Sequence, residues 1–133
     1  MTPLSSPAPH AAPPRVLLLD DDRFMLELLR DMLDGVGPFE VHAELDARSA
    51  LALLPRHAPD YVICDLAMPE MDGIEFLQAA AGQGFAGKII LVSALADGVR
   101  DAATDLARAL GLQVAGAFRK PLALDQLRRA VQC

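Results

Sequence analysis

Polar side chains that could act together follow short apolar runs at four separate places in this sequence. They are two adjacent carboxylates, a third carboxylate, a hydroxyl and an ammonium group: Asp20 and Asp21, Asp65, Ser93, and Lys120. Carboxylates held close together repel one another and retain a proton unless a cation lies between them. No histidine, and no cysteine with metal-ligand spacing, accompanies them. We therefore expect a hard cation with oxygen ligands, Mg²⁺ in preference to Zn²⁺.

The other two groups extend this chemistry toward phosphate. Lys120 offers a positive charge to an anion, and Ser93 offers a hydroxyl donor. A metal ion, a cation and a hydroxyl around a carboxylate are the groups that phosphoryl transfer requires, because positioning and charge neutralisation supply most of its catalysis. The carboxylate can itself accept the phosphoryl group and become an aspartyl phosphate.

Each of these residues also has a structural alternative. Taken singly, Ser93 is a turn residue, Lys120 a solvated surface lysine, and Asp22 and Asp72 are helix caps. The cap explanation does not suit Asp65, because a proline and a glycine in the following turn delay the next helix until about residue 72. A functional interpretation depends on whether the fold brings the groups together.

The elements that must position these groups alternate along the chain. Short apolar runs predict strands, and apolar residues at helical spacing predict helices. The expected strands are residues 15–19, 39–45, 61–64, 88–92 and 113–118. The expected helices are residues 25–36, 46–55, 72–81, 97–110 and 122–131, each following one strand.

The second expected strand differs from the others. Apolar and polar residues alternate over 39–45, whereas several of the other runs are wholly apolar. This alternation predicts an edge strand with one polar face, on which His42 is most simply a solvated side chain. Asp46 is expected to cap the following helix, and Pro55 to end it.

Five alternations of strand and helix predict an α/β domain with a parallel sheet. Right-handed crossovers place helices over both faces of such a sheet. Its ligands bind beyond the carboxyl ends of the strands. The polar groups follow four of the five strands, so they are expected to meet at this one edge, which favours a site over unrelated surface residues.

The composition restricts the remaining possibilities. A chain of 133 residues, 53% hydrophobic and 23% charged, suits one domain with a single core. A net charge of −6 argues against direct nucleic-acid binding, and no stretch approaches the roughly 20 apolar residues of a membrane-spanning helix. Residues 1–14, rich in proline and alanine, are expected to be a disordered leader before a domain of residues 15–133. Cys64 lies in an apolar run, and its use as a buried hydrophobe indicates a cytoplasmic protein.

The motifs resemble those of a response-regulator receiver domain, as in bacterial two-component signalling. The resemblance extends from about residue 15 to the C-terminus, and the pattern Asp-x-x-Met-Pro-x-Met-Asp-Gly is its most specific part. The segments that carry it are residues 17–21 (LLLDD), 65–73 (DLAMPEMDG), 91–94 (LVSA) and 120–121 (KP). The resemblance implies a flavodoxin-like (βα)5 fold with a five-stranded parallel sheet in the order 2-1-3-4-5.

The resemblance also implies an acceptor and a metal site. Asp65 would accept a phosphoryl group from the phosphohistidine of a sensor histidine kinase or a phosphotransfer protein. Asp21, Asp65 and the backbone carbonyl of Ala67 would hold Mg²⁺, with Asp20 acting through water. Such a domain catalyses its own phosphorylation and slow dephosphorylation and does not turn over an external substrate. It would switch an interaction with an output protein that the sequence does not identify.

The same resemblance implies the groups that contact the phosphoryl oxygens. These are the side chains of Ser93 and Lys120 and the backbone at Ala67 and Ala94. The peptide bond between Lys120 and Pro121 is expected to be cis, as it is in the family.

Two features depart from the family pattern. Receivers often carry an aromatic residue three positions before the lysine, where this chain has Ala117, and the adjacent Phe118 should point to the opposite face of its strand. Signalling would then rely on movement of the loop after Ser93. That hydroxyl and Lys120 are 27 positions apart (120 − 93), a few more than usual. The stretch between them is similar to receivers fused to EAL-type cyclic-di-GMP phosphodiesterases.

Ala67 and Leu95 lie two positions after Asp65 and Ser93 and offer no polar side chain to orient an attacking water. Since hydrolysis requires a positioned water, we expect slow loss of the phosphoryl group.

Two other functions compete with this interpretation. A receiver fold that no longer takes phosphate would serve as an interaction module, but the set of acidic, hydroxyl and lysine residues is complete. A haloacid-dehalogenase-type phosphatase also uses an aspartate at a strand end. Such enzymes require a second aspartate two residues later, where this chain has Ala67. A P-loop nucleotide enzyme is excluded, since no glycine-rich Lys-Ser/Thr loop follows a strand.

Overall fold

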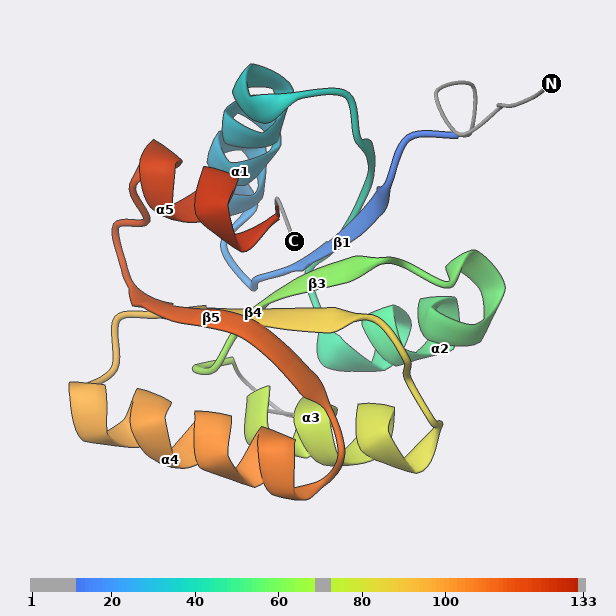
Figure 1. Ribbon diagram of the computed structural model, residues 1–133, viewed down its shortest axis with the longest axis vertical. Helices are drawn as coiled ribbons and strands as arrows, with labels where there is room; N and C mark the ends of the chain where they lie inside the picture. Colours follow the sequence, from blue (N-terminus) through green and yellow to red (C-terminus); the bar gives the residue numbers. More distant parts are fainter. Residues whose placement is uncertain (1–11, 69–72, 132–133) are drawn as a thin grey trace, which may run out of the picture.

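A computed structural model describes residues 12–68 and 73–131 of the chain, over which five strands alternate with five helices (Figure 1). The strands are β1 (Arg15–Leu19), β2 (Glu40–Glu44), β3 (Tyr61–Asp65), β4 (Lys88–Ser93) and β5 (Gln113–Arg119). The helices are α1 (Arg23–Val36), α2 (Ala47–His57), α3 (Gly73–Gly82), α4 (Asp97–Ala109) and α5 (Leu124–Ala130). The predicted leader of residues 1–14 lies largely outside the described residues and stays a prediction.

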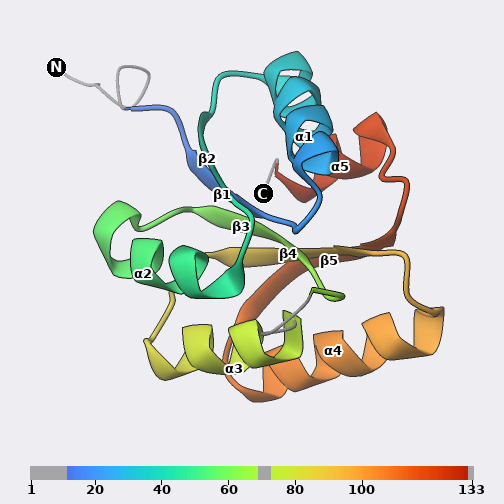
Figure 2. The same cartoon turned by 180° about the vertical axis from the view of Figure 1, so that it is seen from behind.

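The strands form one parallel sheet in the order β2-β1-β3-β4-β5, which confirms the flavodoxin-like α/β fold. Helices α1 and α5 cover one face of the sheet, and α2, α3 and α4 cover the other (Figure 1 and Figure 2). The strand order reverses between β1 and β3. The carboxyl ends of these two strands therefore form the switch point at which ligands bind in such sheets.

Each face of the sheet has its own hydrophobic core. Alternate residues of β1 enter opposite cores: Leu17 and Leu19 pack with α2 and α3, whereas Val16 and Leu18 pack with α1 and α5. Burying each such aliphatic side chain contributes about 1.5–3 kcal/mol. The central β3 is buried at every position, but every residue of β2 is partly exposed. The predicted edge strand is thus confirmed, and the two kinds of sequence pattern match the two environments.

Aspartates begin the first two helices. The Asp22 carboxylate accepts a hydrogen bond from the N–H of Phe24 at 2.9 Å, and the Asp46 carboxylate accepts one from the N–H of Ser49 at 2.9 Å. Each bond satisfies a backbone donor that the first turn of a helix leaves without a partner. Both predicted caps are confirmed, so Asp22 has a structural role apart from its acidic neighbours.

The prediction that α2 ends at Pro55 was wrong. The helix continues through Pro55 to His57, and Ala58 closes it in the left-handed region with φ 44°. A proline inside a helix leaves the carbonyl four residues earlier without its usual donor. Here that carbonyl belongs to Leu51, and the side-chain amide of Gln83 donates to it at 3.3 Å. A distant residue thus replaces the missing bond.

The last helix is shorter than predicted. It begins at Leu124, while Leu122 precedes it as a buried residue of the core beside α1 and α5. The predicted helix cap at Asp72 lies outside the described residues. Among the helices described, none is long and apolar enough to cross a membrane.

Candidate functional site

The carboxyl ends of β1 and β3 bring three carboxylates together. Asp20 follows β1 and is 2% exposed, Asp65 ends β3 and is 5% exposed, and Asp21 is exposed beside them. One oxygen from each of the three lies within 4.8 Å of the others. The register explains this proximity, because Leu19 of β1 pairs with Cys64 of β3, directly before the two acidic positions. We call this group the carboxylate pocket.

Lys120 reaches into the carboxylate pocket from the end of β5. Its Nζ lies 2.8 Å from Oδ2 of Asp20 and 3.4 Å from Oδ2 of Asp65. The backbone N–H of Lys120 donates to the carbonyl of Ser93 at 3.0 Å, which anchors the lysine to the neighbouring strand. The Lys120–Pro121 bond is cis, as the resemblance implied. The ammonium thus bridges two buried carboxylates and lies closer to Asp20.

Burial raises the pKa of the Asp65 carboxyl above its ordinary value. The charge of Asp20 acts in the same direction, while the N–H of Ala67 and the ammonium of Lys120 oppose it without cancelling it. The folded protein therefore disfavours the charged form of Asp65. A further positive charge in the carboxylate pocket would stabilise that form.

Lys120 responds to the same surroundings in the opposite way. Burial alone would lower the pKa of its ammonium, but the hydrogen bond and charge of Asp20, together with Asp65, raise it above the ordinary value. The lysine is therefore charged at neutral pH. Its single positive charge faces the three carboxylates of the carboxylate pocket.

The remaining predicted groups lie at the same edge of the sheet. Ser93 ends β4, next to the Val92 that pairs with Asp65, and is fully buried. Its Oγ accepts a hydrogen bond from the N–H of Leu95 at 3.0 Å. The N–H of Ala67 donates to Oδ1 of Asp65 at 3.1 Å. Ala67 and Ala94 are both exposed residues beside these groups.

The carboxylate pocket suits a hard divalent cation. Its donors are all carboxylate oxygens, and Mg²⁺ is bound through one or two carboxylates together with water. Two of the three carboxylates are buried with only one ammonium between them. This excess of negative charge agrees with the raised pKa of Asp65, and a cation would relieve it.

Two residues that support the site were not predicted from the sequence. A Cβ added to Gly73 would lie 2.5 Å from Cα of Leu66 and 2.8 Å from the carbonyl oxygen of Asp65, so only glycine fits there. The glycine in the turn after Asp65 was a signal for this close approach. Arg100 is 7% exposed and donates to the carbonyl of Leu95 and the carboxylate of Asp97. Nothing in the helical pattern of α4 distinguished it.

Ala117, at the usual aromatic position, and the adjacent Phe118 lie on opposite faces of the sheet, as predicted. Ala117 packs against the core beside α2, α3 and α4, and Phe118 packs against the opposite core. The core next to Ser93 on the side of α4 therefore receives a methyl group from this part of β5, and the aromatic ring lies across the sheet.

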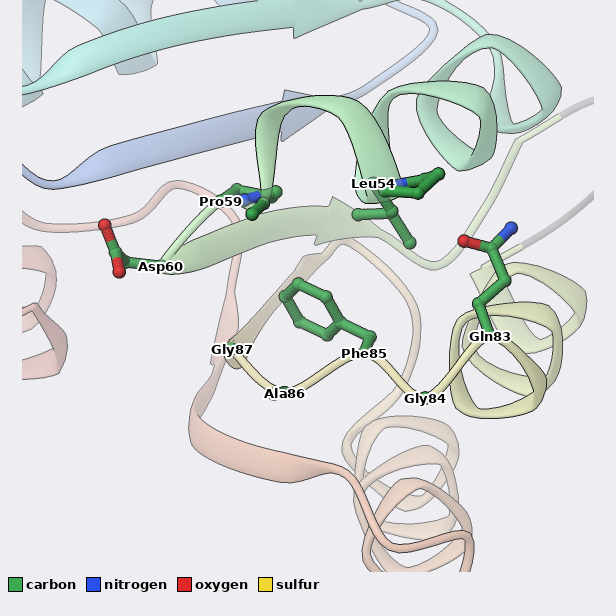
Figure 3. A pocket seen from close by; sticks show the side chains of 10 residues that line it. Leu54, Pro59, Asp60, Gln83, Gly84, Phe85, Ala86 and Gly87 are labelled. Carbon is green, nitrogen blue, oxygen red and sulfur yellow. The ribbon is translucent and has the colours of Figure 1, made fainter.

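A surface cavity of about 370 Å³ lies at the other edge of the sheet, away from the carboxylate pocket. It is bounded by the end of α2 and the segment that follows α3. Figure 3 shows the Phe85 ring between these segments, with Gln83 at one end and Asp60 at the other. The Asp60 carboxylate accepts a hydrogen bond from the N–H of Arg15 at 2.8 Å. None of the residues predicted for phosphoryl transfer lines this cavity.

Comparison with known proteins agrees with this geometry. The response regulator receiver domain family matches residues 16–132. Among curated proteins, the chain is 32% identical over 118 residues to "Regulator of RpoS" from Escherichia coli, covering 88% of this chain and 33% of that protein. It is 33% identical over 115 residues to "Response regulator MprA" from Mycolicibacterium vanbaalenii, covering 86% and 47%. The chain thus spans less than half the length of these relatives.

Solved structures show the same likeness. A response regulator from Colwellia psychrerythraea superposes with a TM-score of 0.74 at 33% identity, over 86% of this chain and 90% of that one. The receiver domain of an HD domain-containing protein from Pseudomonas fluorescens gives a TM-score of 0.79 at 27% identity, over 90% and 92%. With its parallel sheet, its carboxylate pocket and a family match over nearly its whole length, the chain belongs to the response regulator receiver domains of two-component signalling.

Proposed function

We propose that Asp65 is the phosphoacceptor of a two-component phosphorelay. The observation that carries this proposal is the placement of a buried Asp65 carboxylate between Asp20, Asp21 and the ammonium of Lys120. The donor would be the phosphohistidine of a sensor histidine kinase or of a phosphotransfer protein. The family to which the chain belongs supports that class of partner. Such a partner is consistent with the expected cytoplasmic location.

Mg²⁺ would be held by Asp21, Asp65 and the backbone carbonyl of Ala67, with Asp20 acting through water. When bound, it supplies positive charge to the phosphoryl oxygens and to the attacking carboxylate. Asp21 suits direct coordination because it is the exposed member of the carboxylate pocket. Asp20 is already engaged, since it accepts hydrogen bonds from Lys120 at 2.8 Å and from the N–H of Asp22 at 2.9 Å.

In the proposed transfer, an oxygen of Asp65 attacks phosphorus while the bond between phosphorus and the donor imidazole nitrogen breaks. The imidazole leaves and takes up a proton from solvent. The hydroxyl of Ser93, the ammonium of Lys120 and the backbone N–H groups of Ala67 and Ala94 would bind the phosphoryl oxygens. The N–H of Ala67 now donates to Asp65 itself, so it lies within reach of oxygens attached there.

Phosphorylation would then switch an interaction with an output protein. The curated relatives carry different names and are two to three times the length of the matched region, so they do not indicate one shared output. A relation to receivers fused to EAL-type phosphodiesterases stays a prediction from the loop length.

The test is phosphorylation by a small-molecule donor. Acetyl phosphate with Mg²⁺ should add the mass of one phosphoryl group to the wild-type protein and none to Asp65→Asn. The matched control is Asp31→Asn, which changes an exposed aspartate of α1 and should be phosphorylated like wild type. Beryllofluoride with Mg²⁺ should raise the thermal unfolding midpoint only where Asp65 is present.

If wild-type protein gains no mass and no Mg²⁺-dependent stabilisation, the chain is a receiver fold that no longer takes phosphate. Sustained release of inorganic phosphate from an aryl phosphate would instead indicate a phosphatase of the haloacid-dehalogenase type.

The aspartyl phosphate should be long-lived. Ala67 and Leu95 present no polar side chain beside the carboxylate pocket, and only such a group could orient a hydrolytic water. Placing an amide there with Ala67→Asn should shorten the half-life by roughly tenfold, measured by loss of the added mass after removal of the donor. A wild-type half-life of seconds would contradict the prediction.

A further inference from the structure

A second group of potential ligands lies at the amino ends of the strands, opposite the carboxyl ends that carry the carboxylate pocket. Glu40, His42 and His57 each present one ligand atom, and these three atoms lie within 4.8 Å of one another. We call them the histidine cluster. None of them takes part in the phosphoryl transfer proposed above, so the two proposals are independent.

The fold places the histidine cluster at the amino ends of the strands. Glu40 begins β2 opposite Arg15, the first residue of β1, whereas the carboxylate pocket follows the last residues of β1 and β3. Glu40 and His42 are two residues apart on β2, so their side chains lie on one face. His42 pairs with Leu17, whose side chain belongs to the core beside α2, and this register directs the imidazole toward that helix.

His57 comes to the same point because α2 does not stop at its proline. The helix continues two residues beyond Pro55, and His57 is its last residue. The two imidazole rings lie with their centroids 4.1 Å apart at an angle of 35°. His42 therefore has partners on both sides, and the prediction of a simply solvated side chain was incomplete.

The separation of the ligand atoms suits a tetrahedral metal ion. Nε2 of His42 lies 3.4 Å from Oε2 of Glu40, which is longer than an ordinary hydrogen bond. Two ligands about 2.1 Å from a tetrahedral Zn²⁺ are separated by about 3.4 Å, so this pair already has the spacing of one edge of a tetrahedron. His42 and Glu40 are 36% and 42% exposed, which leaves both accessible to an ion from solvent.

Arg15 fixes the surroundings of the histidine cluster. Its NH1 donates to the carbonyl of His57 at 2.9 Å, and its Nε lies 3.5 Å from Oε2 of Glu40. The first contact holds the end of α2 beside the sheet. The second resembles the outer hydrogen bonds that metal-bound carboxylates commonly retain. Because the same oxygen, Oε2, also lies 3.4 Å from Nε2 of His42, Arg15 would contact the carboxylate oxygen that faces the metal ion.

The geometry points to a binding site for one divalent transition-metal ion of the Zn²⁺ class, with Glu40, His42 and His57 as ligands. Two imidazole nitrogens and one carboxylate oxygen favour Zn²⁺ over Mg²⁺, which prefers oxygen ligands. Three protein ligands leave the fourth tetrahedral position for water. The same domain would thus carry two metal sites of different chemistry at opposite edges of its sheet.

The test is Zn²⁺ binding by isothermal titration calorimetry at pH 7.5 in excess Mg²⁺, which occupies the carboxylate pocket. A Cys133→Ser background removes the C-terminal thiol as a competing ligand. We expect one equivalent of Zn²⁺ to bind. The affinity should fall by more than tenfold in His42→Ala and in His57→Ala, since even partners outside the metal ligands contribute tenfold or more, on the order of 10–100-fold.

The matched control is His10→Ala, which removes the third histidine of the chain and should bind Zn²⁺ like the parent. Asp65→Asn should also bind Zn²⁺ unchanged, although it cannot be phosphorylated. Histidine ring signals in NMR spectra should shift for residues 42 and 57 on addition of Zn²⁺, and circular dichroism confirms that each variant is folded. Absence of binding, or binding that survives both His42→Ala and His57→Ala, would overturn the proposal.

Discussion

Polar and charged side chains lie together at both ends of the parallel strands, but their surroundings differ. We call these two strand ends the carboxyl edge and the amino edge of the sheet. At the carboxyl ends, Asp20 and Asp65 are almost wholly buried, and Lys120 bridges them at 2.8 and 3.4 Å. At the amino ends, Glu40 and His42 lie about two-fifths exposed and meet at 3.4 Å. The first site draws on β1, β3 and the residue after β5, whereas the second draws on β2 and the helix that follows it. They differ in depth and in the atoms that they present.

Because of this difference, charge repulsion lowers the stability of the folded state at the carboxyl edge but has little effect on it at the amino edge. The two buried carboxylates share one ammonium, and the remaining excess of negative charge disfavours the folded state, as the raised pKa of Asp65 indicates. A further cation would relieve it. Exposed charges are solvated and screened, so the histidine cluster without a metal ion lowers the stability of the fold very little. Substitutions at the carboxyl edge should therefore change stability strongly, and those at the amino edge weakly.

The largest effect is expected for Lys120→Met. Removing the ammonium leaves Asp20 and Asp65 buried without a counter-charge, which should cost about 3 kcal/mol of unfolding free energy at pH 7 without Mg²⁺. Urea unfolding with EDTA and with Mg²⁺ measures this loss, and Mg²⁺ should restore part of it. The control is Arg119→Met, an exposed cation next in sequence. Equal losses in the two variants would contradict the bridging role of Lys120.

Gly73→Ala should have the next largest effect. Its Cβ would overlap the backbone of Leu66 at 2.5 Å, and relieving this contact displaces the segment that follows Asp65, at a cost of about 1–3 kcal/mol. Gly98→Ala provides the matched control, because no atom lies within 4 Å of the added Cβ. There the same substitution should stabilise α4 by about 0.5 kcal/mol. Thermal unfolding of the pair should show shifts of opposite sign.

Asp65→Asn should stabilise the protein in EDTA, by on the order of 1 kcal/mol at pH 7. The pKa of Asp65 is raised on folding, so the charged form costs stability as the pH rises through the folded value. Below the ordinary value of 3.8 the carboxyl is protonated in both states, and the advantage of the amide should vanish. Saturating Mg²⁺ should reverse the order at pH 7. A variant less stable than wild type in EDTA would show that pairing with Lys120 outweighs burial.

The smallest effect is expected at the amino edge. Glu40→Gln removes an exposed ion pair with Arg15 and alters an exposed contact with His42, so the unfolding free energy should change by less than about 0.5 kcal/mol in EDTA. Urea unfolding checks this value. A loss as large as that of Lys120→Met would remove the contrast between the two edges.

Much of the carboxyl edge could be predicted from the sequence, because its information is local. Each of its polar residues comes within two positions after an apolar run, and a parallel sheet aligns the ends of such runs. The wholly apolar run before Asp65 and the alternating run around His42 likewise identified a central and an edge strand. Residue patterns of this kind depend on neighbours within a few positions.

The features that were missed depend on contacts between distant residues. Where α2 continues past Pro55, Gln83 from the turn after α3 supplies a donor to the Leu51 carbonyl. The meeting of His42 with His57 follows from the two residues by which α2 extends past Pro55, and no motif spacing marks it. Lys120 lies 2.8 Å from Asp20 and 3.4 Å from Asp65, and a sequence pattern cannot predict so small a difference in distance.

Arg100 joins the loop after Ser93 to the body of α4. Its guanidinium donates hydrogen bonds to the Leu95 carbonyl and to the Asp97 side chain, so the loop is bonded to the first turn of the helix. A displacement of the backbone beside the Ser93 hydroxyl would therefore either break a charge-assisted hydrogen bond of the buried Arg100 or tilt α4. Such a tilt would move Val99, which is exposed on the first turn of that helix.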